Sequence, residues 1–273
     1  MAFPDIARRV LVSIIAIPVI LFLSYLGSYY FTCLVLLIGV VAFIEFGMLA
    51  ANKKIFPNYV IGIVSVIFLI INQLFHLIDL LPVLLFISVL LLLTEIFRNK
   101  ENAISNVGTT LLGIFYVGLF SSSLISIREF YPRIDDLYLR GGYIIISMFA
   151  TIWICDSAAY FAGVKFGKHK LMPRVSPSKS WEGAIAGFIF AIITMIIAKS
   201  ILLEFLTLKD VIVLGIIIGF IGQLGDLVES LFKRDSGVKD SSGLIPGHGG
   251  MFDRFDSLLM SAPVIWLYLR YFQ

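Results

Sequence analysis

The sequence contains little charge and almost no cysteine. Only 14% of its 273 residues are Asp, Glu, Lys or Arg, compared with about 25% in ordinary soluble domains. Hydrophobic residues make up 59% of the chain, which is more apolar surface than a soluble fold of this length can bury. Cys33 and Cys155 both fall inside apolar runs, so we expect free packing thiols. The composition therefore excludes a soluble enzyme and a disulfide-stapled secreted domain.

Apolar runs close to the ~20 residues needed to cross a bilayer recur along the chain. They cover residues 10–26, 29–50, 57–75, 77–97, 103–127, 141–166, 183–203, 208–232 and 256–272. The first run follows Arg8 and Arg9, but no small-residue cleavage pattern follows it, so we interpret it as a retained helix. The sequence predicts an all-α, polytopic integral membrane protein with about nine transmembrane helices.

Basic residues are distributed unequally between the two sets of alternating connections. One set carries 15 of the 21 Lys and Arg residues and the other carries six. The basic set includes the N-terminus, residues 165–182 and residues 233–255. By the positive-inside rule, these segments and the N-terminus lie in the cytoplasm, and the C-terminus lies outside. We expect a multi-pass protein of the inner (cytoplasmic) cell membrane with its active site on the cytoplasmic face.

The two halves of the chain differ in character. Residues 1–127 are apolar with short connections and predict a lipid-facing or dimer scaffold, whereas residues 128–273 predict the catalytic transmembrane domain. In the first half, Glu45 and Glu95 lie toward helix ends, where carboxylates can reach water or headgroups, so we assign them structural roles.

Asp156 and Asp226 each interrupt an apolar run shortly before a basic connection. An ionised carboxylate in the hydrocarbon region costs several kcal/mol unless it is paired, so such residues usually face the bundle interior or a wet cavity. We therefore expect both carboxylates to point toward one site at the cytoplasmic end of the molecule.

The polar segment 230–256 carries the strongest signal for chemistry. Asp226, Glu229, Ser230 and Lys233 recur at spacings that place them on one helical face, and Asp253 and Asp256 share a face at the start of the last helix. Carboxylates of Asp226, Asp253 and Asp256 would form an all-oxygen site suited to Mg²⁺. The alternative is that the sequence DRFD only caps the last helix.

The glycines before that helix favour an anion site. Gly249 and Gly250, with Gly247, allow backbone N–H groups to turn toward a phosphate, and His248 can donate a hydrogen bond or act as acid–base. Positive charge for several phosphates is available nearby, although the positive-inside bias explains part of it. It comes from Lys233, Arg234, Lys239 and Arg254.

The connection 167–183 offers a second, weaker phosphate signal. A P-loop is excluded because the spacing fails and His169 stands where Ser or Thr is required. Gly163 and Gly167 form a G-x-x-x-G pair that is typical of helix packing. Ser178 and Lys179, just before a helix start, can bind a phosphate or headgroup.

Together these residues resemble the signature of the phosphatidate cytidylyltransferase (CDP-diacylglycerol synthase) family. The matching positions are Ser230, Lys233, Arg234, Lys239, Asp240, Ile245, Pro246, His248, Gly249, Gly250, Asp253, Arg254 and Asp256. Residues 150–256 carry the close resemblance, and the first half agrees only as hydrophobic spans.

The resemblance implies transfer of CMP from CTP to phosphatidate with release of pyrophosphate. It implies Mg²⁺ at two cation sites, with metal ligands Asp226, Asp253 and Asp256. The implied catalytic residues are Asp226, Lys239, Asp240, His248, Asp253 and Asp256. The implied CTP- and phosphate-binding residues are Ser178, Lys179, Ser230, Lys233, Arg234, Gly249, Gly250 and Arg254.

Phosphatidate already presents an anionic oxygen, so we favour its direct attack on the α-phosphate of CTP. The expected partners are CTP, phosphatidate and the bilayer, with a possible homodimer and no nucleic acid. Two alternatives stay open. One is a CTP-dependent transferase for another lipid phosphate, because acyl-chain contacts are generic. The other is an ion-coupled transporter, which predicts charges at the midplane of two matched halves.

Overall fold

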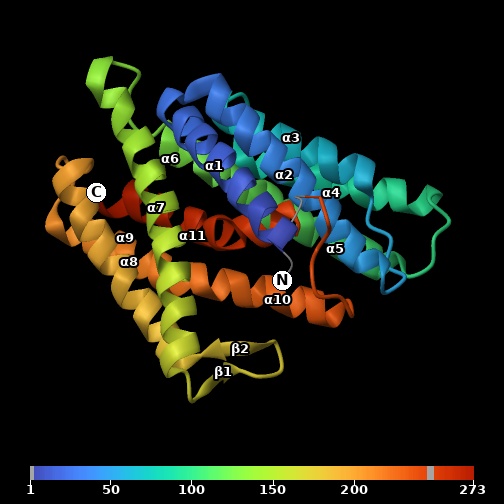
Figure 1. Cartoon of the computed structure of the whole chain (residues 1–273). Helices are drawn as coiled ribbons and strands as arrows, with labels where there is room; N and C mark the ends of the chain where they lie inside the picture. The colour runs from blue at the N-terminus through green and yellow to red at the C-terminus, as the bar shows by residue number, and fades with distance from the viewer. Residues whose placement is uncertain (1–2, 245–248) are drawn as a thin grey trace.

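The computed structural model describes residues 3–244 and 249–273, and it is dominated by long helices (Figure 1). The helices are α1 (Phe3–Leu26), α2 (Ser28–Ala51), α3 (Tyr59–Phe75), α4 (Leu80–Phe97), α5 (Ala103–Gly113), α6 (Phe120–Arg128), α7 (Asp135–Phe166), α8 (Trp181–Ile201), α9 (Leu208–Ile217), α10 (Gln223–Asp235) and α11 (Met251–Phe272). Two π-helical stretches, η1 (Ile114–Leu119) and η2 (Ile218–Gly222), make α5–α6 and α9–α10 continuous.

Six of the described helical segments are long and apolar enough to cross a membrane. They are Ser28–Ala51, Leu80–Phe97, Ala103–Arg128, Asp135–Phe166, Trp181–Ile201 and Leu208–Asp235. Val12–Leu26 and Tyr59–Phe75 are shorter apolar helices. The prediction of an α-helical, multi-pass membrane protein is confirmed, while the count of nine crossings stays a prediction.

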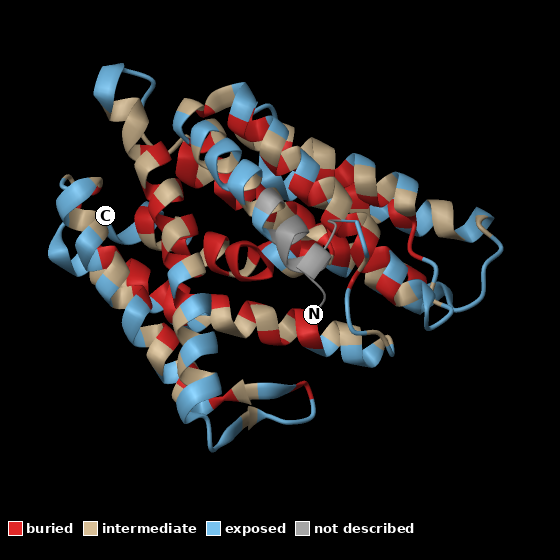
Figure 2. Cartoon of the chain, in the orientation of Figure 1, coloured by how far each residue is buried: buried red, intermediate tan, exposed pale blue. Residues whose placement is uncertain are grey.

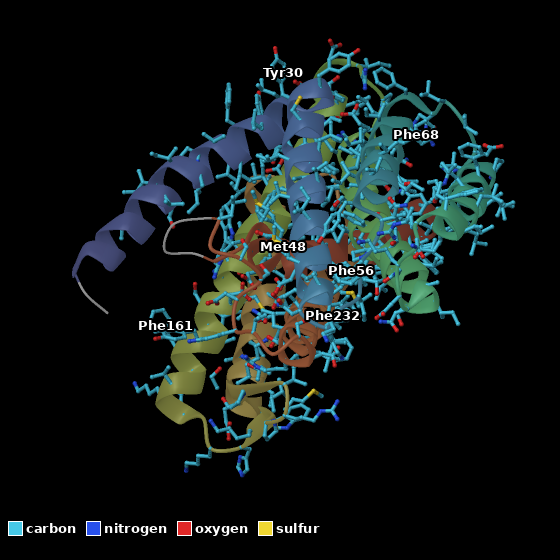
Figure 3. The ribbon with its side chains drawn as sticks, turned by 90° about the vertical axis from the view of Figure 1, so that its right-hand side faces the viewer. Tyr30, Met48, Phe56, Phe68, Phe161 and Phe232 are labelled. Atoms are coloured by element: carbon cyan, nitrogen blue, oxygen red, sulfur yellow. The ribbon has the colours of Figure 1, made fainter. Side chains whose placement is uncertain are left out.

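Contacts between connections show that alternate loops meet at the same end of the molecule. Lys53, after α2, pairs with Asp235 at the end of α10, with 2.8 Å between Nζ and Oδ1. At the other end, the backbone N–H of Ser28 donates to Glu129, and Gln273 donates to the Tyr131 hydroxyl. Figure 3 likewise places Tyr30 at one end and Phe232 toward the other. These contacts join connections that the charge argument assigns to the same set, while the side of the membrane on which each set lies stays a prediction.

The hydrophobic core is continuous across both halves of the chain. Phe43, Val66 and Ile114 from the first half belong to the same buried cluster as Phe252 and Leu259 from the second. α11 packs against α2, α6 and α10, and Figure 2 shows buried residues concentrated where the helices face one another. The start of α11 is thus held between the two halves.

A β-hairpin of β1 (Lys170–Met172) and β2 (Ser176–Ser180) forms within the connection that the sequence predicted only as a loop. Ser180 ends the hairpin and caps α8 by accepting the N–H of Gly183 at 3.2 Å. A Cβ at Gly183 would lie 2.6 Å from the carbonyl oxygen of Ala159 and 3.2 Å from Cα of Gly163. This close approach of α7 and α8 fixes β2 beside the end of α7, and it supports the packing role predicted for Gly163.

Candidate active site

A cavity of about 760 Å³ gathers most of the polar residues that the sequence singled out. Residues of α10, of the start of α11, and of β2 and the end of α7 line it, and Figure 1 shows how these elements are arranged. Its polar lining includes Ser13, Asp156, Ser178, Lys179, Ser180, Gln223, Asp226, Glu229, Lys233, Asp240, Asp253, Arg254 and Asp256. The predicted convergence of Asp156 and Asp226 on one site is therefore found in the structure.

Three carboxylates form the centre of this site. Asp226 and Glu229 on α10 and Asp256 on α11 each offer an oxygen within 4.8 Å of the other two. Glu229 is 1% exposed, and its Oε1 has no hydrogen-bond partner among the described residues. Buried like charges repel unless a cation or proton balances them, and oxygen-rich carboxylate sets are what Mg²⁺ prefers. The donor set and the unpartnered oxygen fit a divalent cation.

The predicted ligand Asp253 lies outside this carboxylate cluster. Its Oδ1 accepts from Lys233 Nζ at 2.8 Å, and its Oδ2 accepts from the N–H groups of Gly250 and Ser241 at 2.9 and 3.1 Å. Asp253 thus caps α11, which was the alternative considered for DRFD, whereas Asp256 faces the cluster. Glu229, and not Asp253, is the third member of the carboxylate cluster. The ligand role of Asp253 stays a prediction.

Two lysines hold positive charge against the carboxylates. Lys179 at the end of β2 forms an ion pair with Asp226. Lys233 bridges two helices, because its Nζ lies 2.7 Å from Glu229 and 2.8 Å from Asp253. Both ammonium groups line the cavity together with Arg254, so phosphate oxygens entering it meet cations on two sides.

Other predicted residues support the walls. Ser230 is buried beside Asp226, with 3.4 Å between the hydroxyl and Oδ1. Arg234 does not line the cavity. Its guanidinium instead donates to the carbonyl oxygens of Val175 and Val238 at 3.2 and 3.1 Å, which ties the hairpin to α10. Lys239 is exposed outside the lining. Their substrate-binding and catalytic roles stay predictions.

The glycine segment is only partly described. Gly249 has φ +83°, a left-handed conformation that favours glycine, as the anion-site prediction requires. Gly250 is buried, however, and its N–H already donates to Asp253 at 2.9 Å. His248 and Gly247 lie outside the described residues.

Sequence reasoning missed two acidic residues of this region. Glu229 lies on the helical face that the spacing predicts, but the spacing alone does not indicate that it joins the carboxylate cluster. The prediction that Glu45 reaches water or headgroups is wrong: Glu45 is 2% exposed and contacts the segment that leads into α11. Its position in an apolar helix gave no local signal for partners about 200 residues away.

The cavity also has an apolar side. Val12, Ala16 and Ile17 of α1 line it opposite Trp153 and Tyr160 of α7. Tyr160 and Ile17 are themselves exposed on the flank of the molecule. The cavity is thus lined by polar groups and by apolar residues of α1 and α7, two helices that also contact each other through Tyr25 and Tyr143.

Comparison with known proteins agrees with this geometry. The profile of the cytidylyltransferase family matches residues 7–272. The chain is 33% identical to the phosphatidate cytidylyltransferase of Bacillus subtilis (strain 168) over 273 residues, covering 98% of this chain and 99% of the relative. It is 33% identical to that of Brucella suis biovar 1 (strain 1330) over 272 residues, covering 97% and 93%. A match at 48% to the Haemophilus influenzae enzyme covers 45% of this chain and 44% of the relative. The chain belongs to the cytidylyltransferase family.

Proposed function

We propose that this protein is a phosphatidate cytidylyltransferase of the cytoplasmic membrane, which uses CTP and phosphatidate to make CDP-diacylglycerol and pyrophosphate. The observation that carries the proposal is the continuity of the cavity. Its polar end offers carboxylates and lysines to a nucleoside triphosphate, and its other end lies between the apolar faces of α1 and α7. A lipid phosphate can enter from the bilayer while the nucleotide arrives from water.

The reaction needs no enzyme nucleophile. An anionic oxygen of phosphatidate attacks the α-phosphorus of CTP, the new P–O bond forms, and the bond to the β-phosphate oxygen breaks to release pyrophosphate. Alignment of the two substrates and neutralisation of their charge are the main catalytic requirements. Lys179 and Lys233 supply positive charge at the cavity wall, and their ion pairs with Asp226, Glu229 and Asp253 fix their positions.

Asp226, Glu229 and Asp256 are the residues we propose to hold Mg²⁺. When bound, the cation supplies Lewis-acid neutralisation of phosphate oxygens. The support is the carboxylate geometry together with the unpartnered Oε1 of Glu229. A second cation site, with Asp253 as a further ligand, stays a prediction, as does homodimer formation through the N-terminal half.

The proposed function is tested with detergent-solubilised protein, CTP, Mg²⁺ and one lipid phosphate at a time. We expect CDP-lipid and pyrophosphate to form with phosphatidate and not with polyprenyl phosphate or with detergent alone. Turnover only with polyprenyl phosphate would favour the related transferase. A protein that consumes no CTP with either lipid would contradict the proposal, and turnover without a sealed vesicle excludes obligate transport.

We propose that the hairpin and the segment 233–255 face the cytoplasm. In a background lacking Cys33 and Cys155, single cysteines are introduced at the exposed positions Lys170, Lys239 and Arg133. In intact cells an impermeant maleimide should label R133C, whereas K170C and K239C should react only after lysis. Labelling of K170C or K239C from outside would reverse the topology.

A further inference from the structure

Glu45 links the N-terminal half of the protein to the first turn of α11. Its Oε1 accepts the N–H of Met251 at 3.0 Å, and its Oε2 accepts the N–H of Phe252 at 2.7 Å. The Ser242 hydroxyl donates to Oε1, and the single proton of the Ser241 hydroxyl is shared between Glu45 Oε2 and Asp253 Oδ2. In Figure 3, Met48, one turn further along α2, lies in the middle of the molecule and away from its ends. Glu45 is thus a buried carboxylate with four donors, all from one segment of the opposite half.

These donors explain why a carboxylate is buried between the helices. The first N–H groups of a helix have no partner within the helix and carry the positive end of its dipole. They are normally capped by the side chain of the preceding residue, which here is Gly250. A Cβ at Gly250 would lie 2.0 Å from the Ser241 hydroxyl oxygen and 2.7 Å from Glu45 Oε2. Glu45 therefore caps α11 from another helix, in space that a side chain at position 250 would fill.

The contacts continue from Glu45 to the carboxylate cluster. Ser241 Oγ lies 3.3 Å from Glu45 Oε2 and 3.0 Å from Asp253 Oδ2. Asp253 pairs with Lys233, and Lys233 pairs with Glu229. The same helical turn that Glu45 caps leads directly to Asp256. Movement of this turn would displace a carboxylate of the cluster and the partner of Lys233 together.

We propose that Glu45 is a positioning residue for cytidylyl transfer, which fixes the first turn of α11 so that Asp253 and Asp256 meet the α10 residues. The proposal rests on the proposed function. Glu45 does not line the cavity, so it acts through other residues and contacts no substrate. Through Glu45, the N-terminal half would contribute to the geometry of the active site and not only to the lipid-facing scaffold.

The test compares Glu45→Gln, Glu45→Asp and Asp210→Asn with the wild type in the complete enzyme. Gln keeps the size of the side chain but directs an NH₂ group at one set of N–H donors. The Asp variant keeps the negative charge, but its side chain is one methylene shorter. Asp210 is a matched control, because it is a buried carboxylate at the start of α9 that accepts from Thr207 and Tyr268, away from the cavity.

We expect Glu45→Gln to lower kcat by roughly tenfold to a hundredfold, since displacements of about 1 Å have effects of this size. The Mg²⁺ concentration for half-maximal rate should rise, and the KM for CTP should change less than kcat. Glu45→Asp should recover part of the rate. Hydrogen exchange of the amides of Met251 and Phe252 should accelerate in Glu45→Gln without substrate or metal, and should be unchanged in Asp210→Asn.

Several outcomes would overturn the proposal. The proposal is wrong if Glu45→Gln keeps the wild-type kcat and Mg²⁺ dependence, or if hydrogen exchange at the start of α11 is unchanged. It is also wrong if the loss of activity only follows the loss of thermal stability and is equal in Asp210→Asn. An inactive wild-type protein would instead contradict the proposed function, and the exchange measurement would still decide whether Glu45 caps α11.

Discussion

Replacing Asp256 by Asn should reduce CTP-dependent turnover by roughly 100-fold or more, the size expected when a group that stabilises transition-state charge is removed. Asp256 is buried within 4.8 Å of the carboxylates of Asp226 and Glu229. Asn keeps the shape of the side chain and removes the anionic ligand. The measurement is CDP-lipid formation across a Mg²⁺ series, and near-normal turnover at saturating Mg²⁺ would remove Asp256 from the ligand set.

The same substitution separates a metal ligand from a structural residue. Without a cation, three adjacent carboxylates repel one another, so Asp256→Asn should melt at or above the wild-type temperature in metal-free buffer. Mg²⁺ should raise the melting temperature of the wild type, because a ligand that binds only the folded state stabilises it. The variant should respond much less. A large loss of stability in metal-free buffer would show that Asp256 mainly supports the fold.

Asp253→Asn is the matched comparison for this experiment. It should also lose nearly all activity, but through Lys233, whose ammonium would keep only Glu229 as its carboxylate partner. Breaking a buried ion pair costs about 3–5 kcal/mol, so this variant should melt below the wild type in metal-free buffer. If it instead keeps its stability and loses the Mg²⁺ response, Asp253 is a metal ligand, as the sequence predicted.

Local patterns in the sequence were sufficient to predict the helices and many of the polar residues that line the cavity. Hydrophobic runs identify the helices because each must present an apolar surface over most of its length. The face shared by Asp226, Glu229 and Lys233 follows from helical spacing alone, and all three line the cavity. The hairpin was not predicted because its short strands carry charged and hydroxyl residues and show no apolar alternation.

The rest of the site depends on contacts between distant segments. Glu45 and Ser241 are separated by 196 positions in the chain. Glu95 pairs with Arg98 three residues away, whereas no basic residue lies within four positions of Glu45, and nothing near it in the sequence indicates its distant partners. The difference between Asp253 and Asp256 is likewise set by tertiary packing. Both begin the same helix, but one side chain turns to Gly250 and Lys233 and the other to α10.

Pyrophosphate exchange should show an all-or-none dependence on lipid. If phosphatidate attacks CTP directly, labelled pyrophosphate enters CTP only when phosphatidate is present to complete the forward and reverse reactions. A covalent cytidylyl-enzyme would allow exchange with CTP alone. Nine of the described residues that line the cavity are Lys, Arg, Asp or Glu, and none of the described lining residues is a histidine that could activate the Ser178 or Ser180 hydroxyl.

The assay follows label in CTP with no lipid, with phosphatidate and with polyprenyl phosphate, and Asp256→Asn serves as the catalytically impaired control. We expect label to enter CTP when phosphatidate is present, and in neither of the other two conditions. Asp256→Asn should lose this exchange. Lipid-independent exchange would contradict direct attack and make His248 or Lys239 the suspected nucleophile. Exchange with polyprenyl phosphate and not with phosphatidate would leave the mechanism intact and change the substrate. The two outcomes are distinct because the first concerns the order of bond formation, whereas the second concerns only which lipid enters between α1 and α7.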